Sequence, residues 1–422
     1  MSSPLRHLRL DGLGGWFLCA VLAAFVVAST SHTRVPIVDA RHYSYLWLGA
    51  VAVALVVASL MAALFRPAAR RLRAAEAMAI LVVMAMIITD VVLAAQPLRD
   101  LGIYLKAGQH YLAGSPVYMQ GTMTVLPRDL TDLPFLYPPI TLPFFGALSL
   151  LPVQLAQAIW VGGSVSLGLL ALRWLGLPWR WAGLALMWPP LFLGLWVGNV
   201  AVPAFALFAL GPLLGAGLVL GATFKSYTGI ASLWLITERR WVEAGVGIGV
   251  LLVLAAVTLP LTGAELWWKW FDGLRLYQNS QTAVPALYGF GLPRFIPYAV
   301  YLAVAVAAIA AALLVRGRES LARLGTATIV ASPSLFGHGL LVAVPSLLSL
   351  RSPWLWLAIG FACTPESPWW LLAVGVIVLS WIAPAMRRAA SPAAAAAEVL
   401  HPLGADGVLW AGLRPAGRPR RP

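Results

Sequence analysis

The sequence predicts an all-α, polytopic membrane protein. Hydrophobic residues make up 61% of its 422 residues and charged residues only 10%, whereas a soluble domain carries about 25% charged residues. The apolar stretches are far longer than the strands of a membrane β-barrel, so they indicate helices. No polar stretch is long enough to fold as a separate soluble domain. The composition therefore predicts one membrane domain with short tails.

The formal net charge of +14 does not indicate nucleic-acid binding. The basic residues lie mostly in short loops and at the two ends, as the positive-inside rule predicts for a membrane protein. We therefore expect membrane lipid, and no nucleic acid, as a partner. Cys19 and Cys363 lie in or beside apolar segments and predict neither a disulfide framework nor a metal site.

Three apolar helices are predicted before residue 97. They are Gly14–Thr30, Tyr45–Phe65 and Glu76–Gln96. The first could also be a cleaved signal peptide, because arginines precede it and small residues follow it. The loop Arg66–Arg73 has four arginines and no acid, which places it inside. That topology puts Asp100, after the third helix, on the outer side.

The predicted outer loop Pro97–Tyr137 is the longest polar stretch between helices. Its first part has an apolar face at helical spacing, which predicts an amphipathic helix lying in the plane of the membrane interface. The face consists of Leu101, Tyr104, Leu105, Gly108, Tyr111 and Leu112. Gly114-Ser115-Pro116 is expected to end this helix.

Two interpretations fit the apolar block Pro138–Leu172. In the first, a short helix, a turn near Pro152 and a second helix follow one another. In the second, Pro138–Leu151 is a re-entrant segment. The sequence leaves both open.

Three later apolar blocks are interrupted by polar residues. The breaks lie at Trp196-Val197-Gly198-Asn199, at Lys225, and from Ser332-Pro333 to His338. The stretches on either side of Lys225 are too short to span a membrane, which takes about 20 residues. Two half-length helices that meet at Lys225 would explain this pattern, and broken helices of that kind line cavities or lie buried in protein.

The remaining chain completes the predicted bundle. A helix at Val242–Leu261 exits, a Trp- and Tyr-rich outer loop follows at Thr262–Pro293, and Ile296–Val315 returns. We predict roughly 11 to 13 membrane segments. Residues 1–386 are expected to form one membrane domain, with a core at about 97–386, and residues 387–422 a disordered, basic cytoplasmic tail.

Few polar residues can carry chemistry in such a chain. Of its three lysines, Lys225 stands out, because a charge in the middle of a membrane helix costs about 2.5 to 3.5 kcal/mol on insertion scales. Asp100 is either a reactive acid or the N-cap of the helix that follows. Asp90, inside the third predicted helix, is a candidate for an ion pair with a cation such as Lys225 or Arg99. Nucleotide-binding and metal-binding motifs are absent, so the substrate is expected from the membrane or from the outer aqueous face.

The order of these elements resembles glycosyltransferase family 87. The matching residues are Asp100-Leu101, Tyr104, Gly114, Tyr118, Tyr137-Pro138-Pro139, Gly198-Asn199, Lys225, Glu238-Arg239-Arg240-Trp241, Asn279-Ser280 and Ser332-Pro333 with His338. The resemblance covers roughly residues 100–381. It implies the GT-C fold and a polyprenol-phosphate-mannose-dependent mannosyltransferase or a similar hexosyltransferase.

The resemblance also implies roles for single residues. Asp100 would be the general base of an inverting transfer, and Lys225 and His338 would stabilise the charge of the leaving polyprenyl phosphate. Further residues that would bind the donor phosphate or sugar are Tyr104, Tyr137, Asn199, Asn279 and Lys106. Asp90 and Asp39 are possible accessory acids. The implied partners are a polyprenyl-phosphate sugar and a glycolipid or glycan acceptor, with no metal and no separate cofactor.

The chain also departs from the family pattern. It has three helices before the expected acid where the family usually has one, which makes Asp39 a rival for Asp100. Asn199 stands where the family usually has glutamine. A membrane transporter or a lipid or sugar flippase is the alternative function, and an inactive scaffold of envelope assembly is a third. The expected location is the plasma membrane, with the active site on the outer face.

Overall fold

The computed structural model describes residues 95–177, 179–350 and 353–363, with isolated helical positions at 83–84, 87–88, 91–92, 371, 374–375, 377–378 and 381. The helices expected at 14–30 and 45–65, the acids Asp39 and Asp90, and the expected tail 387–422 lie outside the described residues. Within the described ranges the chain is helical without strands, and its single β-bridge joins Gly289 to Leu335. The predicted all-α fold is confirmed.

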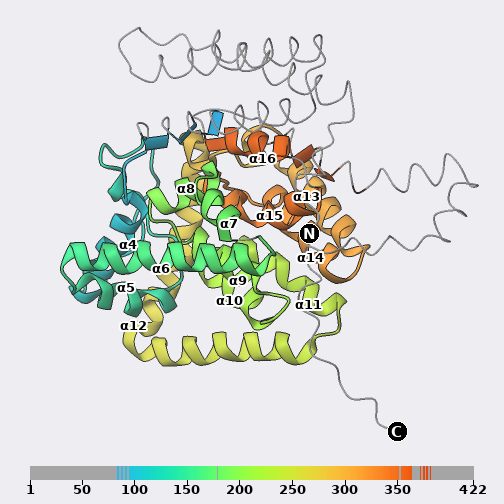
Figure 1. Cartoon of the computed structure of the whole chain (residues 1–422). Coiled ribbons are helices and arrows are strands. Elements are labelled where there is room, and N and C mark those ends of the chain that lie inside the picture. The colour runs from blue at the N-terminus through green and yellow to red at the C-terminus, as the bar shows by residue number, and fades with distance from the viewer. Residues whose placement is uncertain are drawn as a thin grey trace, which may run out of the picture.

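Two of the described helices are long and apolar enough to cross a membrane. They are α6 (Val153–Trp174) and α12 (Trp241–Ala283). In Figure 1, α6 and the first part of α12 run across the view in the same orientation, with α9 (Ala201–Ala209) and α10 (Ala216–Phe224) between them. Protein buries only 11% of an 18-residue apolar stretch of α12. The rest of that apolar surface therefore remains available to lipid.

The α12 helix bends where the sequence predicts that a membrane helix ends. Gly263 has φ 72° and ψ 152°, which are not helical angles, and Pro260 lies inside the helix one turn earlier. Glycine adopts this backbone without a Cβ penalty, and proline lacks the N–H that would continue the ladder. The predicted outer loop at 262–293 is therefore wrong in part, because residues 264–283 continue as helix beyond the bend.

The helix predicted after residue 97 is α4 (Arg99–Leu112). Gly114, with φ 65°, follows its end as the sequence predicts. The buried face differs from the predicted one, since Ile103 and Ala107 are buried while Leu112 is 49% exposed. A Cβ on Gly108 would lie 2.4 Å from the backbone oxygen of Phe145, so α4 packs tightly on α5 (Leu142–Ser149). The buried face of α4 thus packs on protein, whereas the sequence predicts that it lies in the membrane interface.

The segment after residue 138 follows the first of its two interpretations. The 3₁₀ turn η3 (Pro139–Thr141) and the short α5 come first, and α6 begins after Pro152. At 1.5 Å per residue, α5 is too short to span a bilayer, whereas α6 reaches about 33 Å.

The three predicted breaks are confirmed. The first separates α8 (Pro189–Trp196) from α9, and the second places Lys225 between α10 and the 3₁₀ segment η4 (Ser226–Ser232), which α11 (Leu233–Thr237) follows. The third separates α14 (Gly317–Val330) from the 3₁₀ segment η7 (Gly337–Ala343) and α15 (Val344–Leu350). The other described helices are α7 (Trp179–Ala185), α13 (Tyr298–Leu313) and α16 (Pro353–Gly360), and the other 3₁₀ turns are η2 (Leu130–Asp132), η5 (Pro285–Tyr288), η6 (Leu292–Arg294) and η8 (Phe361–Cys363).

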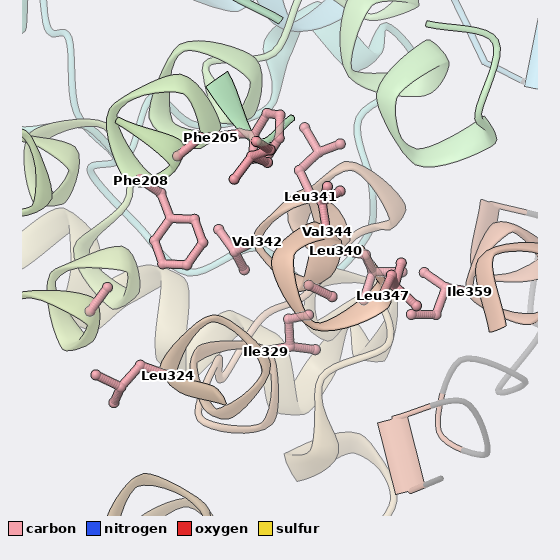
Figure 2. Close-up of a cluster of buried hydrophobic side chains, with 14 of the residues drawn as sticks. Phe205, Phe208, Leu324, Ile329, Leu340, Leu341, Val342, Val344, Leu347 and Ile359 are labelled. Carbon is pink, nitrogen blue, oxygen red and sulfur yellow. The ribbon is translucent and has the colours of Figure 1, made fainter. Parts of the chain in front are cut away.

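The largest apolar core joins helices that lie far apart in the sequence. Figure 2 shows Phe205 and Phe208 of α9 close to Leu341 and Val342 of η7. Leu324 of α14 lies below Phe208 in this view and belongs to the same core. Close packing at this point needs Gly325, because a Cβ there would lie 2.1 Å from the backbone oxygen of Val342. The core therefore fixes η7, which carries His338, against α9 and α14.

Candidate active site

Asp100 lies in the first turn of α4 and is 5% exposed. The N-cap of this helix is Leu98, in the left-handed region at φ 53°, and no side chain caps it. The interpretation of Asp100 as a helix cap is therefore wrong. The N–H groups of Leu98 and Asp100 donate to the carbonyls of Trp196 and Val197, both at 2.8 Å. The start of α4 and the end of α8 thus satisfy each other's open backbone groups.

Three side chains surround the carboxylate of Asp100. The Nε of Arg99 donates to Oδ1 at 2.8 Å, and the Nδ2 of Asn199 donates to Oδ2 at 2.5 Å. The Nε2 of His338 lies 3.7 Å from Oδ2. Each carboxylate oxygen has two lone pairs, so these partners leave Asp100 able to accept a further proton from a bound hydroxyl group.

A tight turn between α8 and α9 presents Asn199 to Asp100. Gly198 has φ 70°, and a Cβ at this position would lie 3.0 Å from the Cβ of Leu101. The indole Nε1 of Trp160 donates to the carbonyl of Gly198 at 2.8 Å. The Oδ1 of Asn199 accepts from the N–H of Ala201 at 2.8 Å, so its NH₂ group must face Asp100. The amide is oriented from both ends.

Lys225 and His338 come from two broken segments and meet near Asp100. Lys225 interacts electrostatically with Asp100 and with His338, and its Nζ lies 5.7 Å from the ring centroid of Tyr227. No ion pair of Lys225 occurs within the described part of the chain. His338 is 3% exposed, and its buried Nδ1 lacks a hydrogen-bond partner there. The described protein therefore leaves the ammonium group of Lys225 without an ion pair and one ring nitrogen of His338 unused.

Two tyrosine hydroxyls link α4 to the same turn. The hydroxyl of Tyr104, a residue only 1% exposed, accepts from the N–H of Val200 at 3.3 Å and shares a 3.1 Å hydrogen bond with the hydroxyl of Tyr137. Burial, Tyr137 and the negative charge of Asp100 raise the pKa of Tyr104 well above its ordinary value. The phenol therefore stays neutral. Because so little of it is exposed, Tyr104 holds the turn in place and offers little surface to a sugar.

Replacing Tyr104 by phenylalanine is expected to lower the free energy of unfolding by about 1 to 3 kcal/mol. The change leaves the buried N–H of Val200 without its acceptor. Thermal unfolding in detergent measures the effect. The matched control is Tyr111→Phe on the same helix, whose hydroxyl donates to the carbonyl of Leu261 in an exposed position. Equal stability losses in both variants would argue against a tether at Tyr104.

Two predicted donor-binding residues lie apart from this cluster. Asn279 is exposed on α12, where its neighbours Ser280 and Gln281 are buried instead. Lys106 forms an ion pair with Asp132, and both side chains are roughly half exposed. The structure thus brings together Asp100, Asn199, His338, Lys225, Tyr104 and Tyr137, but leaves Asn279 and Lys106 outside.

Sequence reasoning missed two residues of the cluster. Arg99 was a possible partner for Asp90 in the sequence, yet its Nε binds Asp100. Its place directly beside the candidate base was a usable signal. Trp160 carries no such signal, because its partner Gly198 is 38 residues away. Across the described residues, no group of three or more His, Cys, Asp or Glu side chains could hold a metal ion.

Comparison with known families gives a match to part of the chain. The model of glycosyltransferase family 87 matches residues 135–343. This confirms the predicted resemblance over a shorter region than residues 100–381. The matched region contains Tyr137, Asn199, Lys225 and His338, whereas Asp100 precedes it. Comparison with curated proteins and with solved structures finds no significant match.

Proposed function

We infer from the family 87 match that this chain is a glycosyltransferase, and we propose that it uses a polyprenyl-phosphate sugar as donor. The sugar is mannose or another hexose, and the acceptor is a lipid-linked sugar or a glycan. The proposed site is on the outer face of the plasma membrane, in line with the arginine-rich loops that the sequence predicts to be inside. Two apolar helices of spanning length agree with a membrane enzyme.

The proposed reaction is a single displacement with inversion. A hydroxyl oxygen of the acceptor forms a bond to the anomeric carbon of the donor sugar. The bond from that carbon to the phosphate oxygen breaks, and its electron pair stays on the phosphate. Asp100 takes the proton of the attacking hydroxyl, because its carboxylate keeps free lone pairs beside the bonds from Arg99 and Asn199.

The departing phosphate needs positive or hydrogen-bonding partners. Lys225 provides a cation without an ion-pair partner in the described ranges, and His338 provides a buried imidazole with an unused nitrogen. Such groups stabilise charge best where water is largely excluded, as it is around a residue that is 3% exposed.

One observation carries this proposal. Asp100 lies before the region that matches family 87, yet Asn199 and His338 within that region lie against its carboxylate. Asp100, which lies outside the matched segment, thereby comes together with Asn199 and His338 inside it. The only buried carboxylate among the described residues is thus at the point where the broken helices meet.

The donor class can be tested with purified protein in lipid nanodiscs. We expect transfer of radiolabelled sugar from a polyprenyl-phosphate hexose to a glycolipid acceptor, and none from the matching nucleotide sugar. Transfer from the nucleotide sugar alone would contradict the proposed donor. Uptake of labelled lipid or sugar into sealed vesicles, without any new glycosidic bond, would support the alternative of a transporter or flippase.

A further inference from the structure

The guanidinium of Arg99 is only partly used by the protein. Its Nε donates to Oδ1 of Asp100, while its two terminal nitrogens make no hydrogen bond in the described ranges. The side chain is 21% exposed. The bond to Oδ1 holds the guanidinium against the same carboxylate that Asn199 and His338 approach. Its terminal N–H groups therefore lie beside the cluster and are unpaired within the described residues.

Within the described residues, the charges of the cluster do not balance. Asp100 supplies one negative charge, whereas Arg99 and Lys225 supply two positive charges, and no other carboxylate within the described residues lies against them. A buried charge without a partner is costly, and a bound anion would offset it. A ligand with a single negative charge would make the site neutral. A phosphodiester, such as a prenyl-phosphate sugar, carries that charge.

We propose that Arg99 bridges the base and the leaving group. Its Nε holds the carboxylate of Asp100, and its two terminal nitrogens bind the phosphate oxygens of the donor. This inference rests on the proposed function. Arginine suits the role because its planar guanidinium can bind a carboxylate on one edge and a phosphate on the other, which the point charge of lysine cannot do. The bridge would fix the spacing between the proton acceptor and the bond that breaks.

A simpler role would be that Arg99 only neutralises Asp100. The two roles differ in ligand binding. A residue that only neutralises Asp100 acts on the phosphate through its charge alone, so Arg99→Lys should bind the phosphate as the wild type does. A bridging residue also contacts the phosphate through its planar guanidinium, so Arg99→Lys should recover only part of the affinity, and full recovery would exclude the bridge. Loss of Asp100 should have the opposite effect on affinity, because Asp100→Asn removes a negative charge from the site.

The test measures binding of a long-chain prenyl phosphate, and of the prenyl alcohol without phosphate, to protein in nanodiscs. We expect Arg99→Gln to weaken binding of the phosphate about tenfold or more and to leave binding of the alcohol unchanged. Arg99→Lys keeps the charge and should recover part of this affinity but little transfer. Arg128→Gln in an exposed segment is the matched control for net charge and should bind as the wild type does.

The outcomes separate this inference from the proposed function. If Arg99→Gln, folded as judged by its melting temperature, binds the prenyl phosphate as tightly as the wild type, the bridge is excluded. Failure of the wild type to prefer the phosphate over the alcohol would exclude it equally. If binding depends on Arg99 but no prenyl-phosphate hexose supports transfer, the anion site stands and the proposed donor reaction fails.

Discussion

Replacing Asp100 by asparagine is expected to reduce sugar transfer by about one hundredfold to ten thousandfold, the range that general bases contribute. The amide has nearly the shape of the carboxylate but cannot accept the proton of the attacking hydroxyl. It also cannot accept hydrogen bonds on both sides, so one of the bonds from Arg99 and Asn199 is lost. Initial rates with saturating donor and acceptor measure the effect.

Donor binding provides the internal check on this variant. Asp100→Asn should bind the prenyl phosphate at least as tightly as the wild type, because a negative charge leaves a site that binds an anion. Glu265→Gln, a change of the same kind at a side chain that is 79% exposed, should transfer at the wild-type rate. Transfer by Asp100→Asn at a rate close to that of Glu265→Gln would show that another acid is the base, and Asp39 would become the next candidate.

Replacing Gly325 by alanine is expected to lower the free energy of unfolding by at least about 1 to 3 kcal/mol, the usual cost of overpacking. The added methyl would lie 2.1 Å from the backbone oxygen of Val342 and 2.8 Å from the ring of Phe208. Figure 2 shows Phe208 beside Val342 in the packed core. Because the obstacle is backbone, α14 and η7 must separate.

That separation should also affect catalysis. His338 is in η7, four residues before Val342, so a shift of this segment moves the imidazole away from Asp100. Melting temperature in detergent and the transfer rate should therefore both fall. Gly163→Ala in α6 is the matched control, since nothing lies within 4 Å of its Cβ position, and it should be neutral or slightly stabilising. Equal stability of the two variants would contradict the packing argument.

The sequence predicted the helical elements well where polar residues interrupt apolar blocks. The breaks at Asn199, Lys225 and His338 all occur as predicted, because a polar group at such a place has to be satisfied by neighbouring protein. The bend of α12 was harder to predict. A Trp- and Tyr-rich stretch fits a loop or an interfacial helix equally well, and only tertiary packing decides between them.

The candidate site was predictable in its residues but not in its geometry. Five of the seven predicted donor-binding residues gather around Asp100, whereas Asn279 and Lys106 do not. Asn279 lies outside the cluster because one step along a helix turns a side chain by about 100°. Its buried neighbours face the interior instead. Such a rotation cannot be read from a short motif.

By itself, the sequence determined that this is a helical membrane protein with broken helices, and it identified the acid and the cation placed where chemistry is possible. Composition and periodicity suffice for the broken helices and for Lys225, since hydrocarbon excludes unpaired polar groups wherever they occur. Asp100 stands out only through the resemblance to family 87. The tertiary structure decided which polar groups meet. It brought Asn199 and His338 to Asp100 over 99 and 238 residues of chain, and it turned Arg99 toward the carboxylate next to it. Contacts between distant segments depend on how helices pack, and no local pattern records them.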